Sequence, residues 1–420
     1  MKIGTFDISS LYLLEKRTIV RIFLYSGMLL AYFGSLNPWF LWPLGSLYIV
    51  PACCLIIVAM LVSNSMESPV FIRRDFLPAI LSYVALLFYQ LFVNGASILG
   101  FMSQIFNIAI FLALFRIDRD ELLYLTTFLA KAMAVLLLVS IPCFILHLLG
   151  FSFPSRNAVF GEDALYSFTN YYFFMIEDGN LFSSILPRFT SVFLEPSHIG
   201  VAAVLLLMTQ CGMWKRWYNL TLLTAVLLTF SLEAYILLAI LFFLALWMQR
   251  KQFLKKMFLF VIFLSILASA AFFYNGGNNL FHDLILLRLE IEDGELAGDN
   301  RVTSDFEKDY SEFVKTSDII LGRNDMDYST FGNSGYRVFI YENGLLGLCL
   351  LLLFYMSFMS HSKDKRAMIT AFILAFLDFI VRAYPLWYSN FIPMYFMVVA
   401  YKYKVLEVNM KNYENCLYLK

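Results

Sequence analysis

Apolar runs separated by short polar stretches dominate the chain. Most of the runs are nearly uncharged and approach the roughly 20 residues that a helix needs to cross a bilayer. The alternation of apolar and polar residues that is typical of a transmembrane β-barrel is absent from them. The pattern therefore predicts an all-α, polytopic integral membrane protein, with residues 1–420 in a single transmembrane domain. About twelve transmembrane helices are expected, over residues 21–36, 40–62, 77–93, 98–115, 122–150, 198–213, 218–231, 234–248, 257–274, 336–358, 367–384 and 387–401.

Two of these runs, 218–231 and 234–248, are short and flank Ser231-Leu232-Glu233. They predict either a re-entrant pair or one long kinked element, which would lower the total to about eleven or ten spans. The first run of the chain follows Lys16 and Arg17, and no small-residue cleavage site comes after it. We therefore expect that run to remain as a signal anchor.

Composition agrees with this fold class, because 60% of the residues are hydrophobic and only 15% are charged. Soluble globular domains are nearer half apolar and a quarter charged. The formal net charge of zero indicates neither an acidic nor a basic partner, and we expect no nucleic-acid binding. The six cysteines have neither the spacing of a metal site nor the pattern of a disulfide framework.

Basic residues orient the predicted spans. If both termini lie inside, the inner loops hold most of the 31 basic residues, and the positive-inside rule then places both termini in the cytoplasm. Two outward-facing loops, 151–197 and 275–335, are much longer than the others. The second predicts an amphipathic helix at about 304–316, opened by a capping box of the form Ser304-x-x-Glu307. This helix lies either on the membrane surface or on the protein as a lid.

Basic residues are scarce in the two outer loops and at their edges, and six of the eight are arginines. A guanidinium binds diphosphate oxygens bidentately and keeps its charge beside an apolar surface. The enrichment in arginine is typical of an anion site for a phosphorylated lipid, while solvation and headgroup contact give a plainer interpretation. The eight residues are Arg156, Arg188, Arg288, Arg301, Lys308, Lys315, Arg323 and Arg337.

The pair Glu195-Pro196 is placed to open a helix, because proline suits the first helical position and a carboxylate suits the positive end of the helix dipole. Glu195 is then either a helix cap or a general base that takes a proton from a sugar hydroxyl. His198, one turn later, either shares that role, binds the acceptor, or is structural.

Charged residues inside the predicted spans are costly in a bilayer, and they mark ion pairs or function. Asp378 and Arg382 are four residues apart on one span, which predicts an ion pair within that helix. For Glu233, Lys131 and Glu342 the sequence leaves open whether the role is structural or lies in a cavity wall.

An acidic pair in the second loop, Asp325-Met326-Asp327, is similar to the pair with which some glycosyltransferases hold a divalent metal. Three residues in a polar loop are a weak signal. The first outer connection, where many metal-dependent membrane glycosyltransferases keep their acidic pair, has no carboxylate. No P-loop, dinucleotide fingerprint or zinc-ligand spacing occurs either. We therefore expect neither a metal nor a cofactor.

Three motifs occur in order on the predicted outer face. The first is Arg188-x-x-Ser191-x-Phe193-x-Glu195-Pro196-Ser197, and the second is Asp299-Asn300-Arg301 followed by the amphipathic helix and Ile320-Leu321-Gly322. The third runs from Tyr336 through Glu342-Asn343-Gly344-Leu345-Leu346-Gly347. Over residues 185–350 this arrangement resembles the bacterial O-antigen and capsular polysaccharide polymerases of the Wzy family, which are related to the O-antigen ligases.

The resemblance implies a glycosyltransferase of the GT-C-like membrane type in the bacterial inner membrane. It would transfer a growing glycan from undecaprenyl diphosphate to a lipid-linked repeat unit at the periplasmic face. Arg188 and Arg301 would hold the donor diphosphate, and Glu195 would act as base or acceptor anchor. The implied partners are the lipid-linked oligosaccharide, the lipid bilayer and a chain-length regulator protein. The other residues expected to line the site are His198, Arg288, Arg323, Asn333, Tyr336 and Arg337.

The chain departs from both families at named positions. Asn333 stands where the ligases have histidine, and Ser334 where they have asparagine. The missing histidine favours a polymerase over a ligase and places more weight on Glu195 as the base. The R-x10-G loop motif of the polymerases is not met either, because the spacing from Arg188 to Gly200 is one residue too long.

Two alternatives remain beside the polymerase. An O-antigen ligase would move finished glycan to a lipid core. A flippase or transporter of lipid-linked oligosaccharides belongs to another class. Such flippases tend to have short loops on both faces and basic residues within the bundle, whereas here two long loops share one face.

Overall fold

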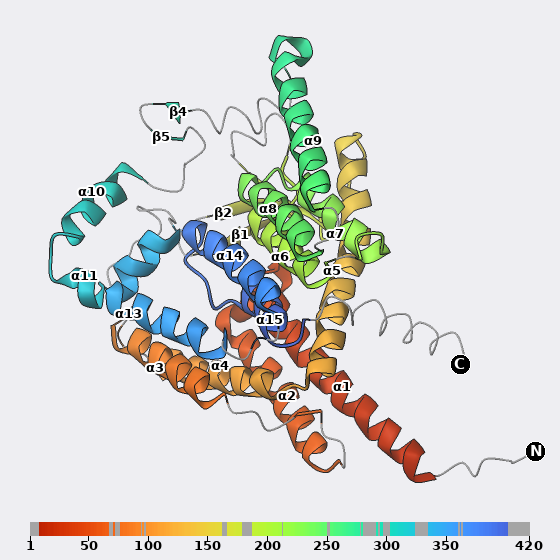
Figure 1. Cartoon of the computed structure of the whole chain (residues 1–420), viewed down its shortest axis with the longest axis vertical. Helices are drawn as coiled ribbons and strands as arrows, with labels where there is room; N and C mark the ends of the chain where they lie inside the picture. Colours follow the sequence, from red (N-terminus) through yellow and green to blue (C-terminus); the bar gives the residue numbers. More distant parts are fainter. Residues whose placement is uncertain are drawn as a thin grey trace, which may run out of the picture.

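Helices dominate the structure, a computed structural model of the chain (Figure 1). It describes residues 8–66, 70–71, 76–93, 95, 98–161, 166–178, 187–211, 213–249, 253–277, 279, 291–292, 295–296, 303–323, 335–359, 362 and 364–401. The helices are α1 (Ile8–Gly34), η1 (Trp39–Tyr48), α2 (Ile49–Asn64), α3 (Leu77–Val93), α4 (Ile98–Arg116), α5 (Arg119–Leu148), α6 (Pro196–Thr209), α7 (Trp217–Leu228), α8 (Leu232–Gln249), α9 (Phe253–Phe273), η4 (Tyr274–Gly277), α10 (Ser304–Phe313), α11 (Asp318–Leu321), α13 (Gly335–Met359), α14 (Lys365–Val381) and α15 (Tyr388–Val399). The strands are β1 (Arg156–Phe160), β2 (Tyr166–Asn170), β3 (Met175–Glu177), β4 (Ile291–Glu292) and β5 (Glu295–Leu296).

Helix α6 lies at the centre of the helical bundle. Every one of its residues is buried, as expected of a helix that is apolar on all sides. It packs against α5, α7, α8, α14 and α15. The contact with α8 is especially close at Gly200, where an added Cβ would lie 2.7 Å from the Cβ of Ala234. The start of α6 is therefore held inside protein on all sides.

Three helical stretches of the described chain are long and apolar enough to cross a membrane, namely Trp39–Asn64, Arg119–Leu148 and Gly335–Met359. Large apolar side chains are exposed on other helices as well, such as Phe92 on α3 (79%) and Leu254 on α9 (73%). Apolar surface of this kind is typical of helices that contact lipid. The structure therefore confirms a mostly helical protein suited to a bilayer.

The two short runs around Ser231 form two separate helices, α7 and α8. Helix α7 has 12 residues and so is about 18 Å long, whereas the hydrocarbon core is about 30 Å thick. The break falls at Phe230, whose φ of 46° is unusual for a residue with a bulky side chain. Because α7 is too short to span the bilayer alone, a total of twelve spans is not confirmed.

The first of the two long loops contains an antiparallel sheet of order β1-β2-β3, which the all-α prediction missed. Phe168 and Met175 of this sheet are buried together with Leu194. Trp39 and Trp42 of η1 pack against these three residues. The sheet therefore braces the segment that leads into α6 against η1.

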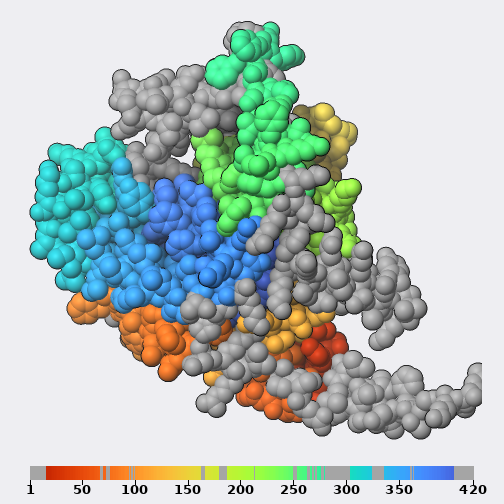
Figure 2. All heavy atoms as spheres, viewed as in Figure 1, coloured from red at the N-terminus to blue at the C-terminus, as the bar shows by residue number. Residues whose placement is uncertain are grey.

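Helix α10 lies where the sequence predicts an amphipathic helix, in the second of the two long loops. Its N-cap is Thr303 rather than Ser304, because the Thr303 side chain accepts a hydrogen bond from the backbone N–H of Phe306. Phe306 and Phe313 are both fully buried, and their rings contact Tyr341 of α13. Figure 2 shows α10 and α11 in cyan against α13 in blue. Of the two alternatives left open by the sequence, packing on protein is therefore the one that the structure adopts.

We predict that Phe313→Ala detaches α10 from α13. Removing a buried phenylalanine ring costs about 3–5 kcal/mol, so amide hydrogen exchange in α10 should accelerate by at least about 100-fold. Hydrogen exchange measured by mass spectrometry on the reconstituted protein checks this. The matched control is Val314→Ala, because Val314 is 44% exposed and its removal should leave exchange nearly unchanged. Equal exchange in the two variants would contradict the packing described here.

Candidate functional site

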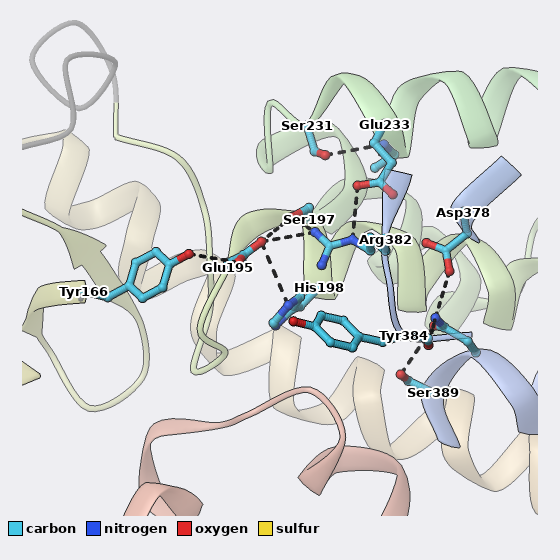
Figure 3. A network of polar contacts seen from close by, with 12 residues as sticks. Tyr166, Glu195, Ser197, His198, Ser231, Glu233, Asp378, Arg382, Tyr384 and Ser389 are labelled. Carbon is cyan, nitrogen blue, oxygen red and sulfur yellow. Dashed lines mark hydrogen bonds and ion pairs between the residues drawn. The ribbon is translucent and has the colours of Figure 1, made fainter. Parts of the chain in front are cut away.

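A buried arginine joins the ends of three helices (Figure 3). Arg382 directly follows α14, and its side chain is only 5% exposed. Its Nη2 lies 3.1 Å from Oε2 of Glu195, and its Nε lies 3.2 Å from Oε2 of Glu233. Nη2 also donates a hydrogen bond to Oγ of Ser197. These residues, together with His198, are called the Arg382 cluster below, and they tie the starts of α6 and α8 to the end of α14.

Glu195 is the N-cap residue of α6, with Pro196 at the first helical position. Its carboxylate makes no capping hydrogen bond to the helix. Oε2 instead accepts a hydrogen bond of 3.0 Å from Oγ of Ser197 and faces Arg382. The interpretation of Glu195 as a side-chain helix cap is therefore wrong, and its carboxylate belongs to the cluster.

The segment before Glu195 is fixed by backbone hydrogen bonds. The N–H of Met175 in β3 donates to the carbonyl of Ser191 at 2.9 Å, and the N–H of Trp39 donates to the carbonyl of Val192 at 3.0 Å. The hydroxyl of Thr190 also donates to the carbonyl of Met175 at 2.9 Å. The sheet and η1 thus hold this segment from two sides, and they set the position from which Glu195 enters the cluster.

His198 lies one turn into α6 from Glu195 and is more deeply buried. Its side chain is 3% exposed, and its Nε2 lies 3.9 Å from Oε2 of Glu195. The edge of its ring contacts Trp387 at 5.0 Å between ring centroids, and Trp387 in turn stacks on Tyr384 at 4.5 Å. The structure therefore brings together two of the predicted site residues, His198 and Glu195, and adds an aromatic wall beside them.

The cluster contains more carboxylates than guanidinium groups. Arginine stays protonated in proteins, so Arg382 with Glu195 and Glu233 has a formal charge of −1 when both carboxylates are ionised. One guanidinium shared by two carboxylates cannot neutralise both of their charges. Glu195 is 26% exposed whereas Glu233 is 4% exposed. The accessible carboxylate of the cluster is therefore Glu195.

Tyr166 of β2 marks the accessible side of Glu195. Its hydroxyl donates to Oε1 of Glu195 at 3.5 Å. Burial and then the nearby Glu195 carboxylate raise the pKa of the Tyr166 phenol above its ordinary value. The phenol therefore stays neutral and can orient Oε1 of the carboxylate.

Arg188 borders the same region. Its Nε donates to the carbonyl of Thr229 at 3.3 Å, and the N–H of Phe189 donates to the carbonyl of Leu228 at 3.2 Å. Residues 229–231 connect α7 to α8, and α8 carries Glu233 into the cluster. The structure therefore places Arg188 at the α7–α8 connection, beside the cluster rather than within it.

Three other predicted site residues lie around α10, α11 and α13. Nε of Arg323 contacts Oδ2 of Asp318 at 2.8 Å, and Nη1 of Arg337 contacts Oε1 of Glu307 at 2.6 Å. Both charges are thus paired locally and hold this part of the second loop together. Tyr336 lines a cavity of about 540 Å³ between α13 and α14. None of the three contacts the Arg382 cluster directly in the described part of the chain.

The remaining predictions fall outside the described residues. These are the site residues Arg288, Arg301 and Asn333 and the acidic pair Asp325 and Asp327. Among the residues that the structure does describe, no group of three His, Cys, Asp or Glu side chains is arranged to hold a metal ion.

The predicted ion pair between Asp378 and Arg382 within one helix is wrong. Helix α14 ends at Val381, and Arg382 is extended, with φ −129° and ψ 133°. Its side chain consequently points to α6 and α8, while Oδ2 of Asp378 accepts a hydrogen bond of 2.8 Å from Asn390. Sequence reasoning therefore missed the central residue of the site and its partner Glu233. The only signal for either was a charge in an apolar run.

We predict that Arg382→Ala lowers the stability of the protein strongly. Removing one partner of a buried ion pair costs about 3–5 kcal/mol because the remaining charges lose their compensation. Thermal unfolding followed by circular dichroism in detergent measures the loss. The control is Arg156→Ala, since Arg156 is exposed and lies over the ring of Trp39 at 4.7 Å, a contact worth about 0.5–1 kcal/mol. Equal losses for the two variants would contradict the central role of Arg382.

Comparison of the chain with family models, with curated proteins and with solved structures finds no match. The likeness to polysaccharide polymerases in three motifs therefore stays a prediction. Any functional argument has to start from the cluster itself and from the apolar helices around it.

Proposed function

We propose that the protein is an O-antigen or capsule polysaccharide polymerase. In this proposal it transfers a growing glycan from undecaprenyl diphosphate to a lipid-linked repeat unit at the periplasmic face of the bacterial inner membrane. The observation that carries the proposal is the accessible Glu195 carboxylate in a buried cluster with an excess of carboxylate charge. Helices suited to a bilayer support it further, because both substrates carry lipid tails.

The proposed reaction is a displacement at the anomeric carbon of the donor glycan. A hydroxyl oxygen of the acceptor sugar forms the new bond to that carbon, and the bond from the carbon to the diphosphate oxygen breaks. The hydroxyl proton passes to Glu195, and the bonding electrons leave with the lipid diphosphate. Attack from the side opposite the leaving group would invert the configuration at that carbon.

Arg382 and Glu233 act on Glu195 in this scheme as positioning residues. The guanidinium fixes Oε2 at 3.1 Å, which leaves Oε1 toward Tyr166 as the proton acceptor. Glu233, at 3.2 Å from Nε of the same guanidinium, shares its positive charge with Glu195. A base held in a fixed orientation and protonation state contributes roughly 10²–10⁴-fold to proton transfer.

Arg188 and Arg301 are the residues proposed to bind the donor diphosphate. A guanidinium matches two phosphate oxygens at once and offsets the charge that develops as the bond to the diphosphate breaks. The position of Arg188 at the α7–α8 connection, which leads to Glu233, supports its part in this role.

The direct test uses purified protein reconstituted in lipid and supplied with lipid-linked repeat units. Formation of a ladder of longer glycans supports a polymerase. Transfer only to an added lipid A core acceptor would instead show a ligase. The absence of any covalent product, together with movement of the repeat unit across the bilayer, would show a flippase and overturn the proposal.

We predict that Glu195→Gln lowers the rate of polymerisation, measured per amount of folded protein, by roughly 10²–10⁴-fold, while Glu233 still pairs Arg382. The amide keeps the shape of the side chain but cannot take the proton. The control is Asp178→Asn in the same outer loop, where the carboxylate is exposed and bonded to Thr169, and this variant should polymerise normally. Polymerisation by Glu195→Gln at the rate of the control would remove Glu195 from the mechanism.

We also predict that Arg188→Ala and Arg301→Ala each shorten or abolish the polymer, because the leaving diphosphate loses a charge-assisted contact worth about 1.5–3 kcal/mol. That energy corresponds to roughly a 10- to 150-fold loss of rate. Gel analysis of the polymer at matched protein level measures the effect. Polymer of normal length from both variants would show that neither arginine binds the donor.

A further inference from the structure

A second cavity is lined by the aromatic side chains that adjoin the Arg382 cluster. Its volume is about 330 Å³, within the low end of the range of about 300–1,000 Å³ that is usual for small-molecule sites. Tyr384 and Trp387 line it, and Trp387 is the ring that contacts His198. One layer of aromatic side chains therefore separates this cavity from His198, whose ring is 3.9 Å from the Glu195 carboxylate.

Among the residues that the structure describes, the lining of this cavity contains no ionisable acid or base other than tyrosine hydroxyls. It combines the amides of Gln90, Gln104 and Asn107 with serine hydroxyls and with several aromatic rings. An uncharged lining gives no charge compensation to a phosphate or a carboxylate. Amides present donors and acceptors together, which matches ligand hydroxyls that need both.

Part of the polar lining is held in place and part is available. Oδ1 of Asn107 accepts a hydrogen bond of 2.7 Å from the Tyr388 hydroxyl, and Nδ2 of Asn107 donates to Oε1 of Gln104 at 3.4 Å. The Gln90 side chain, by contrast, makes no hydrogen bond to any residue that the structure describes, although it is half-buried. A fixed amide pair beside an amide without a protein partner is the arrangement of a site prepared for a polar ligand.

Aromatic rings complete the match to a sugar. Tyr48, Tyr83, Tyr384 and Trp387 all line the cavity. Flat apolar faces next to hydrogen-bonding edges suit a pyranose ring, which has C–H groups on its faces and hydroxyls around its rim. The larger cavity between α13 and α14 lacks this mixture, because its lining is almost wholly apolar apart from two tyrosines.

We propose that the cavity lined by Gln90, Gln104, Asn107 and the Tyr384–Trp387 stack binds a neutral sugar unit of the acceptor glycan. The assignment of the sugar to the acceptor rests on the proposed function, whereas sugar binding itself follows from the lining. The arrangement segregates the substrates by charge. The anionic diphosphate is bound on the arginine side of the aromatic layer, and the uncharged acceptor glycan is bound on the other.

The test measures binding and turnover separately on the full-length protein in nanodiscs. The probe for binding is the oligosaccharide released by mild acid from the lipid-linked repeat unit of the same cells, titrated by isothermal calorimetry. The double variant Gln90→Leu with Gln104→Leu should weaken its binding by at least about tenfold, since two hydrogen-bonding amides are lost. If the double variant is unstable, the single variant Gln90→Leu, at a half-buried position, should still weaken binding of the oligosaccharide.

The control is Ser82→Ala. Ser82 lies on the same helix α3 but outside the cavity lining, and its hydroxyl donates to backbone carbonyls of its own helix.

In the polymerisation assay, the double variant should raise KM for the lipid-linked repeat unit by about tenfold with little change in kcat, because ground-state binding is lost rather than chemistry. Unchanged binding and unchanged KM in the glutamine variants would overturn the inference and leave the polymerase proposal intact. No binding of the oligosaccharide to the unaltered protein would overturn it as well. Binding that depends on Gln90 in a protein that forms no polymer would uphold the sugar site and refute the polymerase.

Discussion

The structure depends on one buried guanidinium. An isolated charge at a site as enclosed as that of Arg382 costs several kcal/mol in desolvation, so the residue is stable there only if its partners are in place. Those partners stand at the first residues of α6 and α8, Glu195 and Glu233. The requirement to pair Arg382 therefore fixes where three helix ends meet. It also accounts for a break between α7 and α8, because the chain must leave α7 in time to place Glu233 at the start of the next helix.

The outer segments are arranged around this point from two directions. On one side, the sheet and η1 hold the residues before α6 through hydrogen bonds to Ser191 and Val192. On the other side, α13 begins against the end of α14. Gly335 has a φ of 38°, and a Cβ at this position would lie 2.0 Å from the carbonyl oxygen of Ile380. Only glycine tolerates both conditions. The α10–α11 segment, which packs on α13, is therefore mechanically linked to the backbone that precedes Arg382.

Local features of this protein were readable in the sequence, while its long-range pairings were not. The helix start at Pro196 and the amphipathic α10 follow from short-range rules, and both starts agree with the prediction to within a residue, although α10 ends three residues earlier than predicted. The sequence pattern did not indicate the sheet, because its strands have five, five and three residues and are too short for a periodic signal. Arg382 pairs with Glu195 across 187 positions, and no spacing rule reaches so far. The nearest acid in sequence, Asp378, was a plausible partner only while both residues were assumed to be helical.

In the proposed polymerase, charge segregation is the physical reason that two substrates can lie next to each other without exchanging sites. Arg382 is already paired with Glu195 and Glu233, so Arg188 beside the cluster is the residue that provides positive charge to an anion within the apolar bundle, where pairing is stronger than in water. Across the Tyr384–Trp387 stack the lining is neutral, so a diphosphate would lose its hydration there without compensation. A glycan loses less, because amides and hydroxyls replace the water that it leaves. The aromatic layer then serves as the boundary between the two environments. His198 and Glu195 lie on the charged side of that boundary.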